Sequence, residues 1–249
     1  MDATLYSLSL SHPSAAVRGM LRRKGIPHRV VQLVPGFHPV ALRGLGFRGT
    51  TVPAVVLDGR RTQGSCVISR ELDAIRPEPP LFPREPQARR RVEEAERWGE
   101  QVLQNVPRRL FRFTAARDYE VRRWLAVDVT GVPLGGVVAR PSLQARLFAR
   151  AAGADEAAVR ADLATLGDHL AEVERLRAEG VIGGDEPNAA DFQIASSLLS
   201  LAKLGDLAPH LHDHPAVRWA GTLLPALPGP TPRALPAEWL RPLAALRTA

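Results

Sequence analysis

Three short segments in the first sixty residues are apolar and rich in residue types that favour strands. Apolar, β-prone runs at residues 5–8, 29–34 and 54–57 predict three strands. The dipeptide Asp58-Gly59 follows the third run and predicts a tight hairpin turn. A fourth strand is therefore expected over residues 60–62.

Two helices are predicted between and after these strands. The first covers residues 15–24, because its apolar side chains fall on one face and Gly25 follows it as a helix terminator. The second begins at Ser65, a residue type that caps helices. Its apolar stripe has helical spacing and consists of Ile68, Leu72 and Ile75. Residues 1–76 thus predict an α/β domain with the order βαβ and then ββα.

A proline-rich connector separates this domain from a second one. Residues 77–86 contain five prolines, which exclude a regular helix and favour an extended, semi-rigid segment. Strand-like patterns nearly vanish beyond it, so residues 87–249 predict an all-helical domain. Its tail at 225–242 is again rich in proline, and we expect it to lie extended over the helices, anchored by Trp239 and Leu240.

Three helices of the second domain have clear signals. Residues 87–106 predict a charged amphipathic helix, and residues 159–173 repeat apolar side chains every three or four positions. Asn188 opens a third helix, with Asp191 as its capping-box partner. The apolar seam of the first helix suits either the bundle or a contact between subunits, and consists of Val92, Ala95, Gly99, Val102 and Val106.

Composition describes a globular chain that is able to bury a core. Of its 249 residues, 45% are hydrophobic and 24% are charged, with a mean hydropathy of −0.10. Apolar runs stay short of the roughly 18 residues that a membrane-spanning helix needs. The first residues lack the positive and apolar segments of an export signal. We therefore expect a cytoplasmic protein without a membrane partner.

Charge and cysteine content exclude two further classes. The net charge is +7, but arginines alternate with acidic residues along the chain, so we expect no nucleic-acid partner. The single cysteine, Cys66, has no internal disulfide partner and belongs to no Cys-x-x-Cys pair. Thiol-disulfide exchange between two protein sulfurs is therefore excluded.

Five segments in a fixed order carry a resemblance to a known family. They are Leu5-Tyr6-Ser7 with Ser11 to Arg18, Thr51 to Gly59, Gly64-Ser65-x-x-Ile68, Gly184 to Phe192, and His214-Pro215 with Val217 and Trp219. Together they resemble the cytosolic glutathione transferases. That family has a thioredoxin-like first domain and an all-helical second domain, which agrees with the fold class read from the hydrophobic pattern.

The resemblance implies attack of a glutathione thiolate on an electrophile, with the enzyme lowering the pKa of the thiol. Ser11 occupies the place of the family's catalytic Ser or Cys, before the first helix, where a hydroxyl and the helix dipole favour a thiolate. Ser9 and Ser14 are alternatives in the same loop, which also contains His12 and Pro13. The competing interpretation is that these serines only cap the helix.

The thiol-binding residues implied by the resemblance are Val52, Pro53, Gly64 and Ser65. Val52 precedes a cis-proline, and its backbone pairs with the thiol peptide. Ser65 begins the helix whose N-terminus receives the γ-glutamyl carboxylate. Gly64 departs from the family, because it lacks the acidic or amide side chain that holds the γ-glutamyl amine. Gln63 is adjacent, but a shift of one residue at a strand end points its side chain elsewhere. We therefore expect weak glutathione binding, or another small thiol as cosubstrate. The Val-Pro turn also has a purely structural interpretation.

Other motifs have competing interpretations. Arg109 and Phe113 are candidates for a second-substrate site. The arginine group of this region suits either an acidic-substrate pocket or a solvated helix face. It consists of Arg108, Arg109, Arg112, Arg117, Arg122 and Arg123. The neighbouring aromatic residues suit either an electrophile wall or the core, and are Phe111, Phe113, Tyr119 and Trp124. A glycine pattern at 44–49 precedes a strand, unlike a dinucleotide-binding motif. The histidines of 210–214 have no evident further ligands, so we expect no metal.

The leading prediction is a homodimeric glutathione transferase-like enzyme that activates glutathione or another low-molecular-weight thiol against an apolar electrophile. One alternative is a non-catalytic protein of the same fold that binds a ligand or a protein. Another is an isomerase or lyase that uses the thiol as a cofactor at the same site.

Overall fold

The structure is a computed structural model that describes residues 2–131, 139–140, 142–225 and 229–247. Its first part contains a four-stranded mixed sheet of order β2-β1-β3-β4. The strands are β1 (Ala3–Ser7), β2 (His28–Gln32), β3 (Ala54–Leu57) and β4 (Arg60–Gln63). The helices of this part are α1 (His12–Arg23), α2 (His38–Gly44) and α3 (Ser65–Ile75). The predicted βαβ-ββα order is confirmed.

Strand pairing determines which loops meet. β1 runs parallel to β2 and antiparallel to β3, with Tyr6 opposite Ala54. β3 and β4 are antiparallel, with Ala54 opposite Gln63. The loop after β1, the turn before β3 and the loop after β4 therefore lie at the same edge of the sheet.

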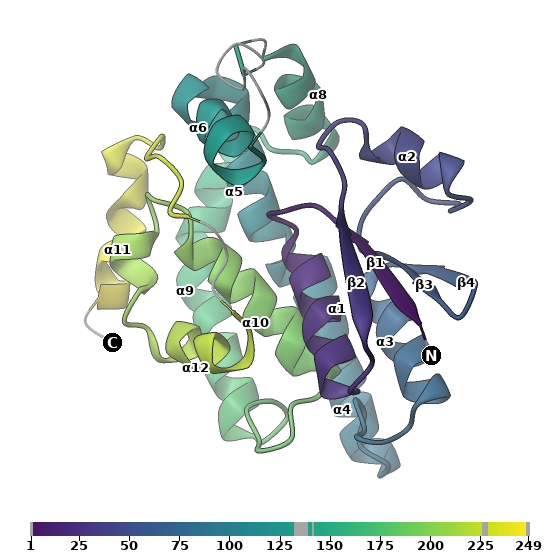
Figure 1. Cartoon of the computed structure of the whole chain (residues 1–249). Helices are drawn as coiled ribbons and strands as arrows, with labels where there is room; N and C mark the ends of the chain where they lie inside the picture. The colour runs from purple at the N-terminus through teal and green to yellow at the C-terminus, as the bar shows by residue number, and fades with distance from the viewer. Residues whose placement is uncertain (1, 132–138, 141, 226–228, 248–249) are drawn as a thin grey trace.

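Helix α2 was not predicted. It has seven residues, of which only Leu42 is buried, so it offers little periodic signal. Leu42 packs with Phe47 and Ala54 on the face of the sheet opposite to α1 and α3. Figure 1 shows α1 and α3 between the sheet and the helical part, with α2 on the far side.

A long helical segment begins the second part. α4 (Pro86–Trp98) leads into the π-helical turn η1 (Gly99–Leu103) and then into α5 (Asn105–Arg117). The predicted helix at 87–106 therefore exists, but it continues past residue 106 and contains a π turn. Four of its five seam residues are buried within the chain, and Val102 is partly exposed. The seam thus serves the bundle in this structure.

α10 is the central helix of the second part, and its side chains are almost all buried. α10 contacts α1, α4 and α12, so it joins the two parts of the chain. The helical elements that follow α5 are α6 (Tyr119–Trp124), η2 (Leu125–Val129), α8 (Leu143–Ala151), α9 (Glu156–Ala178), α10 (Ala189–Ala202), α11 (Ala208–Leu211), α12 (Pro215–Leu223) and η3 (Ala237–Arg247). None of the described helices is long and apolar enough to span a membrane.

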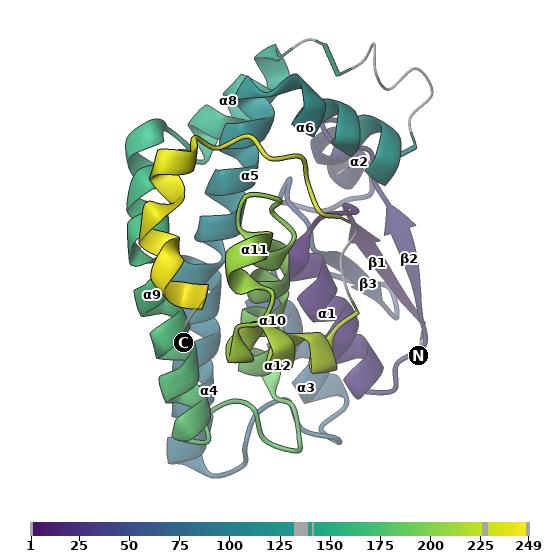
Figure 2. The ribbon, with the colours of Figure 1, turned by 90° about the vertical axis from the view of Figure 1, so that its left-hand side faces the viewer.

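The expectation of an extended tail is wrong beyond residue 236. Residues 237–247 form a 3-10 helix that runs beside α9 (Figure 2), because alanine and leucine favour helical backbone around Pro242. The proposed anchors are confirmed. The Trp239 ring lies 5.7 Å from the Phe113 ring, and Leu240 packs against the core.

A buried lysine ties the connector to the first part. The Lys24 ammonium is fully buried and donates to Asp73 Oδ1 at 2.7 Å and to the Arg76 carbonyl at 2.6 Å. Asp73 Oδ1 also accepts from the Leu81 backbone N–H at 2.8 Å. Because these partners satisfy the buried charge, the end of α1, the end of α3 and the connector are held together.

The capping box of α10 is confirmed. Asn188 Oδ1 accepts from the N–H groups of Ala190 and Asp191, while Asp191 Oδ2 accepts from the Asn188 N–H at 2.7 Å. Asp191 Oδ1 also accepts from the Gly183 N–H at 2.6 Å. The Asp191 carboxylate therefore holds both the helix start and the preceding loop.

Replacing Asp191 with alanine leaves two backbone N–H groups without their acceptor. We expect Asp191→Ala to lower the free energy of unfolding by about 2–4 kcal/mol, measured by urea denaturation. Ser142→Ala is the control: Ser142 precedes α8 but makes no side-chain cap bond, so its substitution changes stability by less than about 0.5 kcal/mol. Equal losses in both variants would contradict this role of the capping box.

Candidate active site

Three short segments meet at one edge of the sheet. They are the loop 8–11 after β1, the turn Val52-Pro53 before β3, and Gly64-Ser65 after β4. The Val52-Pro53 peptide bond is cis, as the sequence predicted. The Gly64 N–H donates to the Pro53 carbonyl at 3.1 Å and fixes the second and third segments to each other.

Ser11 lies at the N-terminus of α1 and is half-buried. Its Oγ accepts hydrogen bonds from the Ser14 N–H at 3.3 Å and from the Ser14 hydroxyl at 2.8 Å. Ser11 is therefore the helix cap, and with Ser14 as the donor no hydrogen bond donated by the Ser11 hydroxyl is found among the described residues. A capped helix start and a free hydroxyl proton are compatible, so the capping role does not exclude a chemical one.

The other residues of this loop differ in accessibility. Pro13 and Ser14 are buried in the first turn of α1, where Ser14 serves as the donor to Ser11. Ser9 lies in the turn before the helix and is half-buried. Of the three serines, Ser11 has the arrangement best suited to donate to a ligand.

The turn before β3 presents free backbone groups. Val52 is half-buried, and its backbone N–H and C=O make no hydrogen bond to any described residue. An extended peptide ligand pairs with such groups in the same way as an added strand. This arrangement agrees with the thiol-binding role expected for Val52 and Pro53.

Gln63 does not point a free amide into the site. Its Oε1 accepts from the Gly49 N–H at 2.7 Å, and its Nε2 donates to the Thr51 carbonyl at 3.1 Å. The side chain therefore holds the loop that leads into Val52-Pro53. This agrees with the expectation that the Gln63 side chain points away from the place left open at Gly64.

Gly64, rather than Ser65, is the N-cap position of α3. Its φ of 88° and ψ of 133° belong to a region that glycine adopts far more easily than other residues. A side chain at this position carries a strain of about 1–3 kcal/mol. Ser65 is buried in the first turn of α3 and does not cap it, which corrects the cap assignment made from the sequence.

The helical part supplies a carboxylate to the N-terminus of α3. Ser65 Oγ donates to Glu100 Oε1 at 3.5 Å, and Glu100 is half-buried in the π turn η1. Glu96, one turn earlier, is fully buried and accepts from Ser69 Oγ at 2.6 Å. Burial raises the pKa of the Cys66 thiol, and Glu96 and Glu100 raise it further. Cys66 therefore stays a protonated thiol.

The same long helix also faces the starts of α1 and α2. His12 lies against the backbone of Gln104, and the charges of Arg108 and Arg112 act on its ring. Arg112 also acts on His38, the first residue of α2. The segment from Glu100 to Arg112 thus borders the site with an acidic end at α3 and a basic end at α1 and α2.

Arg109 and Phe113 do not face this site. Arg109 Nε donates to Asp162 Oδ2 of α9 at 2.6 Å, and Phe113 is buried against Trp239. This corrects their assignment to a second-substrate site. The neighbouring Arg108 and Arg112 lie beside the site instead. They follow Gln104 at intervals of four residues, a spacing that puts all three residues on one face of the helix.

His12 is buried among groups that oppose its protonation. Burial lowers its pKa to about 3, with smaller contributions from the positive charges of Arg108 and Arg112, while the Gln104 backbone opposes the shift. His12 Nε2 has no hydrogen-bond partner among the described residues. The ring is therefore neutral at physiological pH.

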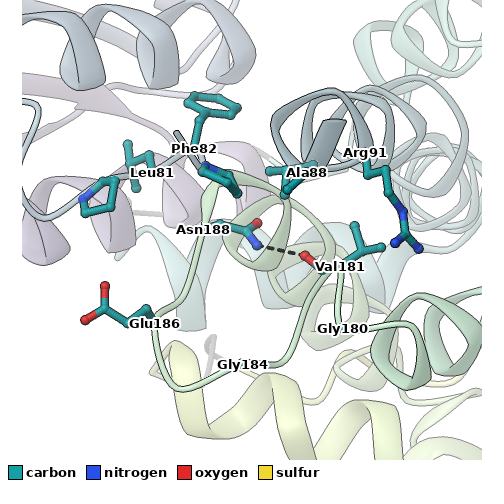
Figure 3. A pocket seen from close by; sticks show the side chains of 12 residues that line it. Leu81, Phe82, Ala88, Arg91, Gly180, Val181, Gly184, Glu186 and Asn188 are labelled. Carbon is teal, nitrogen blue, oxygen red and sulfur yellow. Dashed lines mark hydrogen bonds between the residues drawn. The ribbon is translucent and has the colours of Figure 1, made fainter. Parts of the chain in front are cut away.

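A pocket of about 310 Å³ lies elsewhere, between the connector, α4 and the loop before α10. Its lining includes Phe82, Arg91 and Glu186, and Figure 3 shows the Asn188 amide donating to the Val181 carbonyl beside it. None of the residues predicted for thiol binding lines this pocket. The glycine pattern of 44–49 lies at the end of α2 and in the turn after it. Of the histidines at 210–214, His214 caps α12.

Comparisons with known proteins agree with this arrangement. Residues 5–80 match the family described as glutathione S-transferase, N-terminal domain. A search among curated proteins found no match. A glutathione S-transferase from Sinorhizobium meliloti 1021 has a similar structure, with a TM-score of 0.61 and 20% identity over 97% of this chain and 99% of that one.

Two further solved structures cover both parts of the chain. A glutathione S-transferase from Rhodospirillum rubrum F11 has a TM-score of 0.59 and 20% identity over 96% of this chain and 99% of that one. One from Methylobacterium radiotolerans JCM 2831, in complex with glutathione sulfonate, has a TM-score of 0.53 and 19% identity over 94% and 100%. The chain thus shares the fold of these solved structures, with a thioredoxin-like N-terminal domain, matched over residues 5–80, and a helical C-terminal region.

The buried His12 makes stability depend on pH. Below about pH 6.5 the unfolded chain protonates this ring, whereas the folded chain resists protonation until about pH 3. Stability is therefore lost as the pH falls through this window, with a contribution from His12 of about 1.4 kcal/mol per pH unit.

Urea denaturation between about pH 6.5 and 5 measures this slope. We expect His12→Gln to reduce the slope by the contribution of one proton, while a measurement at about pH 8 reports the packing cost of the substitution separately. An identical slope in the parent and the variant would contradict the assignment.

Proposed function

We propose that this glutathione S-transferase-like protein activates a small thiol, glutathione or another low-molecular-weight thiol, for attack on an apolar electrophile. The observation that carries the proposal is the Ser11 hydroxyl, which keeps a free proton at the N-terminus of α1. A hydroxyl donor and the positive end of a helix both stabilise a thiolate relative to a thiol. The two effects lower the pKa of a bound thiol toward neutrality.

The thiol peptide is proposed to lie along the sheet edge. The free backbone groups of Val52 support pairing with its main chain, and the N-terminus of α3 supports its γ-glutamyl carboxylate. Two solved structures of similar fold carry glutathione sulfonate or glutathione, which supports a ligand of this class. The homodimer, expected from the resemblance, and the cytoplasmic location, expected from the sequence, both stay predictions.

Glu100 is proposed to bind the γ-glutamyl amine. Gly64 offers no side chain for this ammonium group, but Glu100 brings a carboxylate from the helical part to the Ser65 hydroxyl. A carboxylate beside a helix N-terminus forms a site with two signs of charge, which suits an amino acid end group. Glu100 thus takes the role that Gly64 and Gln63 do not have, and it removes the reason to expect weak glutathione binding.

The role of Ser11 is tested by the pKa of the bound thiol. We expect Ser11→Ala to raise this pKa by about one unit, because a hydrogen bond to a charged group contributes about 1.5–3 kcal/mol. Ultraviolet absorbance of the thiolate and the pH dependence of kcat/KM both report it. The activity lost near neutral pH should return in alkali.

Ser14→Ala is the matched control, because Ser14 touches Ser11 through its hydroxyl and not the proposed thiol. Its effect on the thiol pKa should be smaller than that of Ser11→Ala. An equal or larger effect would transfer the role to Ser14. Thiol binding without any transfer reaction would favour the non-catalytic alternative, and turnover without consumption of the thiol would favour the isomerase or lyase.

The role of Glu100 is tested with two thiols. We expect Glu100→Gln to weaken glutathione binding about tenfold, measured by calorimetry, and to leave binding of mercaptopropionate, which has no amine, within about twofold. Glu94→Gln is the control, because Glu94 is exposed on the same long helix. An equal loss for both thiols would show that Glu100 acts on the fold and not on the ammonium group.

A further inference from the structure

We propose that the electrophile carries an anionic group, such as a carboxylate, and that Arg108 and Arg112 bind this group. The inference rests on the proposed function and adds the class of electrophile to it. It replaces a purely apolar second substrate with an amphiphilic one.

The two arginines are half-buried without a carboxylate partner. Arg108 donates to Asn105 Oδ1 at 3.1 Å, and Arg112 donates to the Phe148 carbonyl at 3.4 Å. Neither forms an ion pair with any described residue. Burial lowers the pKa of both guanidinium groups. The charge of Glu100 opposes this shift for Arg108, whereas Arg108 lowers the pKa of Arg112 further. Two neighbouring, partly desolvated positive charges are costly unless an anion accompanies them.

Four neighbouring arginines have partners of several kinds. Arg109 is paired with Asp162, and Arg123 is paired with Glu120. Arg122 donates to backbone carbonyls, and Arg117 lies over the Phe113 ring. Arg108 and Arg112 differ from them because their charges act on the His12 ring, beside the Ser11 loop.

His12 indicates where the two arginines lie relative to Ser11. The ring of His12, which directly follows Ser11, lies against Gln104 and within the electrostatic reach of both arginines. Its Nε2 is buried without a partner, so the strip between α1 and α5 contains unsatisfied polar groups beside the proposed thiol. An anionic group held there brings the rest of an electrophile toward the Ser11 loop.

Apolar side chains flank the basic end of the site. Arg112 reaches the backbone of α8, and the Gly36 backbone before α2 contacts the Gln144 side chain of α8. Large exposed apolar side chains lie on α8 and on α2 with its N-cap residue. They are Phe37, Val40, Leu143 and Leu147. A ligand with an apolar body and an acidic end suits two guanidinium groups that have exposed apolar side chains on neighbouring elements.

The anionic group takes no part in the bond changes. The thiolate sulfur attacks the carbon that bears the leaving group and forms a C–S bond. The leaving group departs with the electron pair of its own bond, and the proton of the thiol goes to solvent. The arginines act as substrate-binding residues that orient the carbon toward the sulfur.

The experiment compares two electrophiles of the same skeleton, neutral chlorodinitrobenzene and anionic chlorodinitrobenzoate. The readout is the ratio of kcat/KM for the anion to kcat/KM for the neutral compound. We expect the parent to prefer the anion and Arg112→Gln to reduce the ratio about tenfold. Arg108→Gln is a second variant with the same expectation.

Arg90→Gln is the control, because Arg90 is exposed on α4 and its loss removes the same charge. It should leave the ratio unchanged. Equal losses for both electrophiles in Arg112→Gln and Arg108→Gln, or an unchanged ratio in both, would overturn the inference. A fall in glutathione affinity with an unchanged ratio would assign the arginines to a carboxylate of the thiol and overturn it too.

Binding of dinitrobenzoate, which has no leaving group, separates this inference from the proposed function. We expect it to raise the melting temperature of the parent and of Arg90→Gln, and to do so much less for Arg112→Gln. If this pattern appears without any thiol transfer, the anion site stands and the proposed reaction fails. If transfer occurs but dinitrobenzoate does not bind, the reaction stands and the anion site fails.

Discussion

The packing of α1 against α10 determines where every part of the site lies. A Cβ at Gly19 would lie 2.6 Å from Phe192 Cδ1, closer than a real side chain allows, so glycine is what permits the two helices to approach. Ser11 and His12 begin α1, while Lys24, directly after it, holds the connector. A shift of α1 on α10 would therefore move the proposed thiol site relative to the long helix that borders it.

The long helix has a π turn at the point where it passes the site. Gln104 donates to the Gly99 carbonyl five residues earlier, so more residues fill this turn than in an α-helix. Leu103 rather than Val102 is buried as a result, and Glu100 stays beside α3 while Arg108 and Arg112 border α1 and α2. One helix thereby presents opposite charges to two ends of the same site.

Local patterns in the sequence were sufficient to predict most helices and strands and the loops of the proposed thiol site. The Val-Pro turn, the Asn188 cap and Ser11 each depend on neighbours within a few residues, and the structure places them as expected. Glu100 and the pair Arg108 and Arg112 were not separable from other charged residues in the sequence. Their position depends on the π turn and on the contact between the two parts, which no local period encodes.

The environment of Cys66 agrees with the proposal that the reacting thiol is not the protein's own. Cys66 lies in the first turn of α3, where the helix dipole alone would favour a thiolate. Burial and the carboxylates of Glu96 and Glu100 outweigh the dipole and keep the sulfur protonated. Near Ser11 the balance is reversed, because the helix start faces two arginines and a neutral histidine. Under the proposed function, the acidic end of the site keeps the protein's own sulfur protonated, and the basic end stabilises the thiolate of a bound thiol.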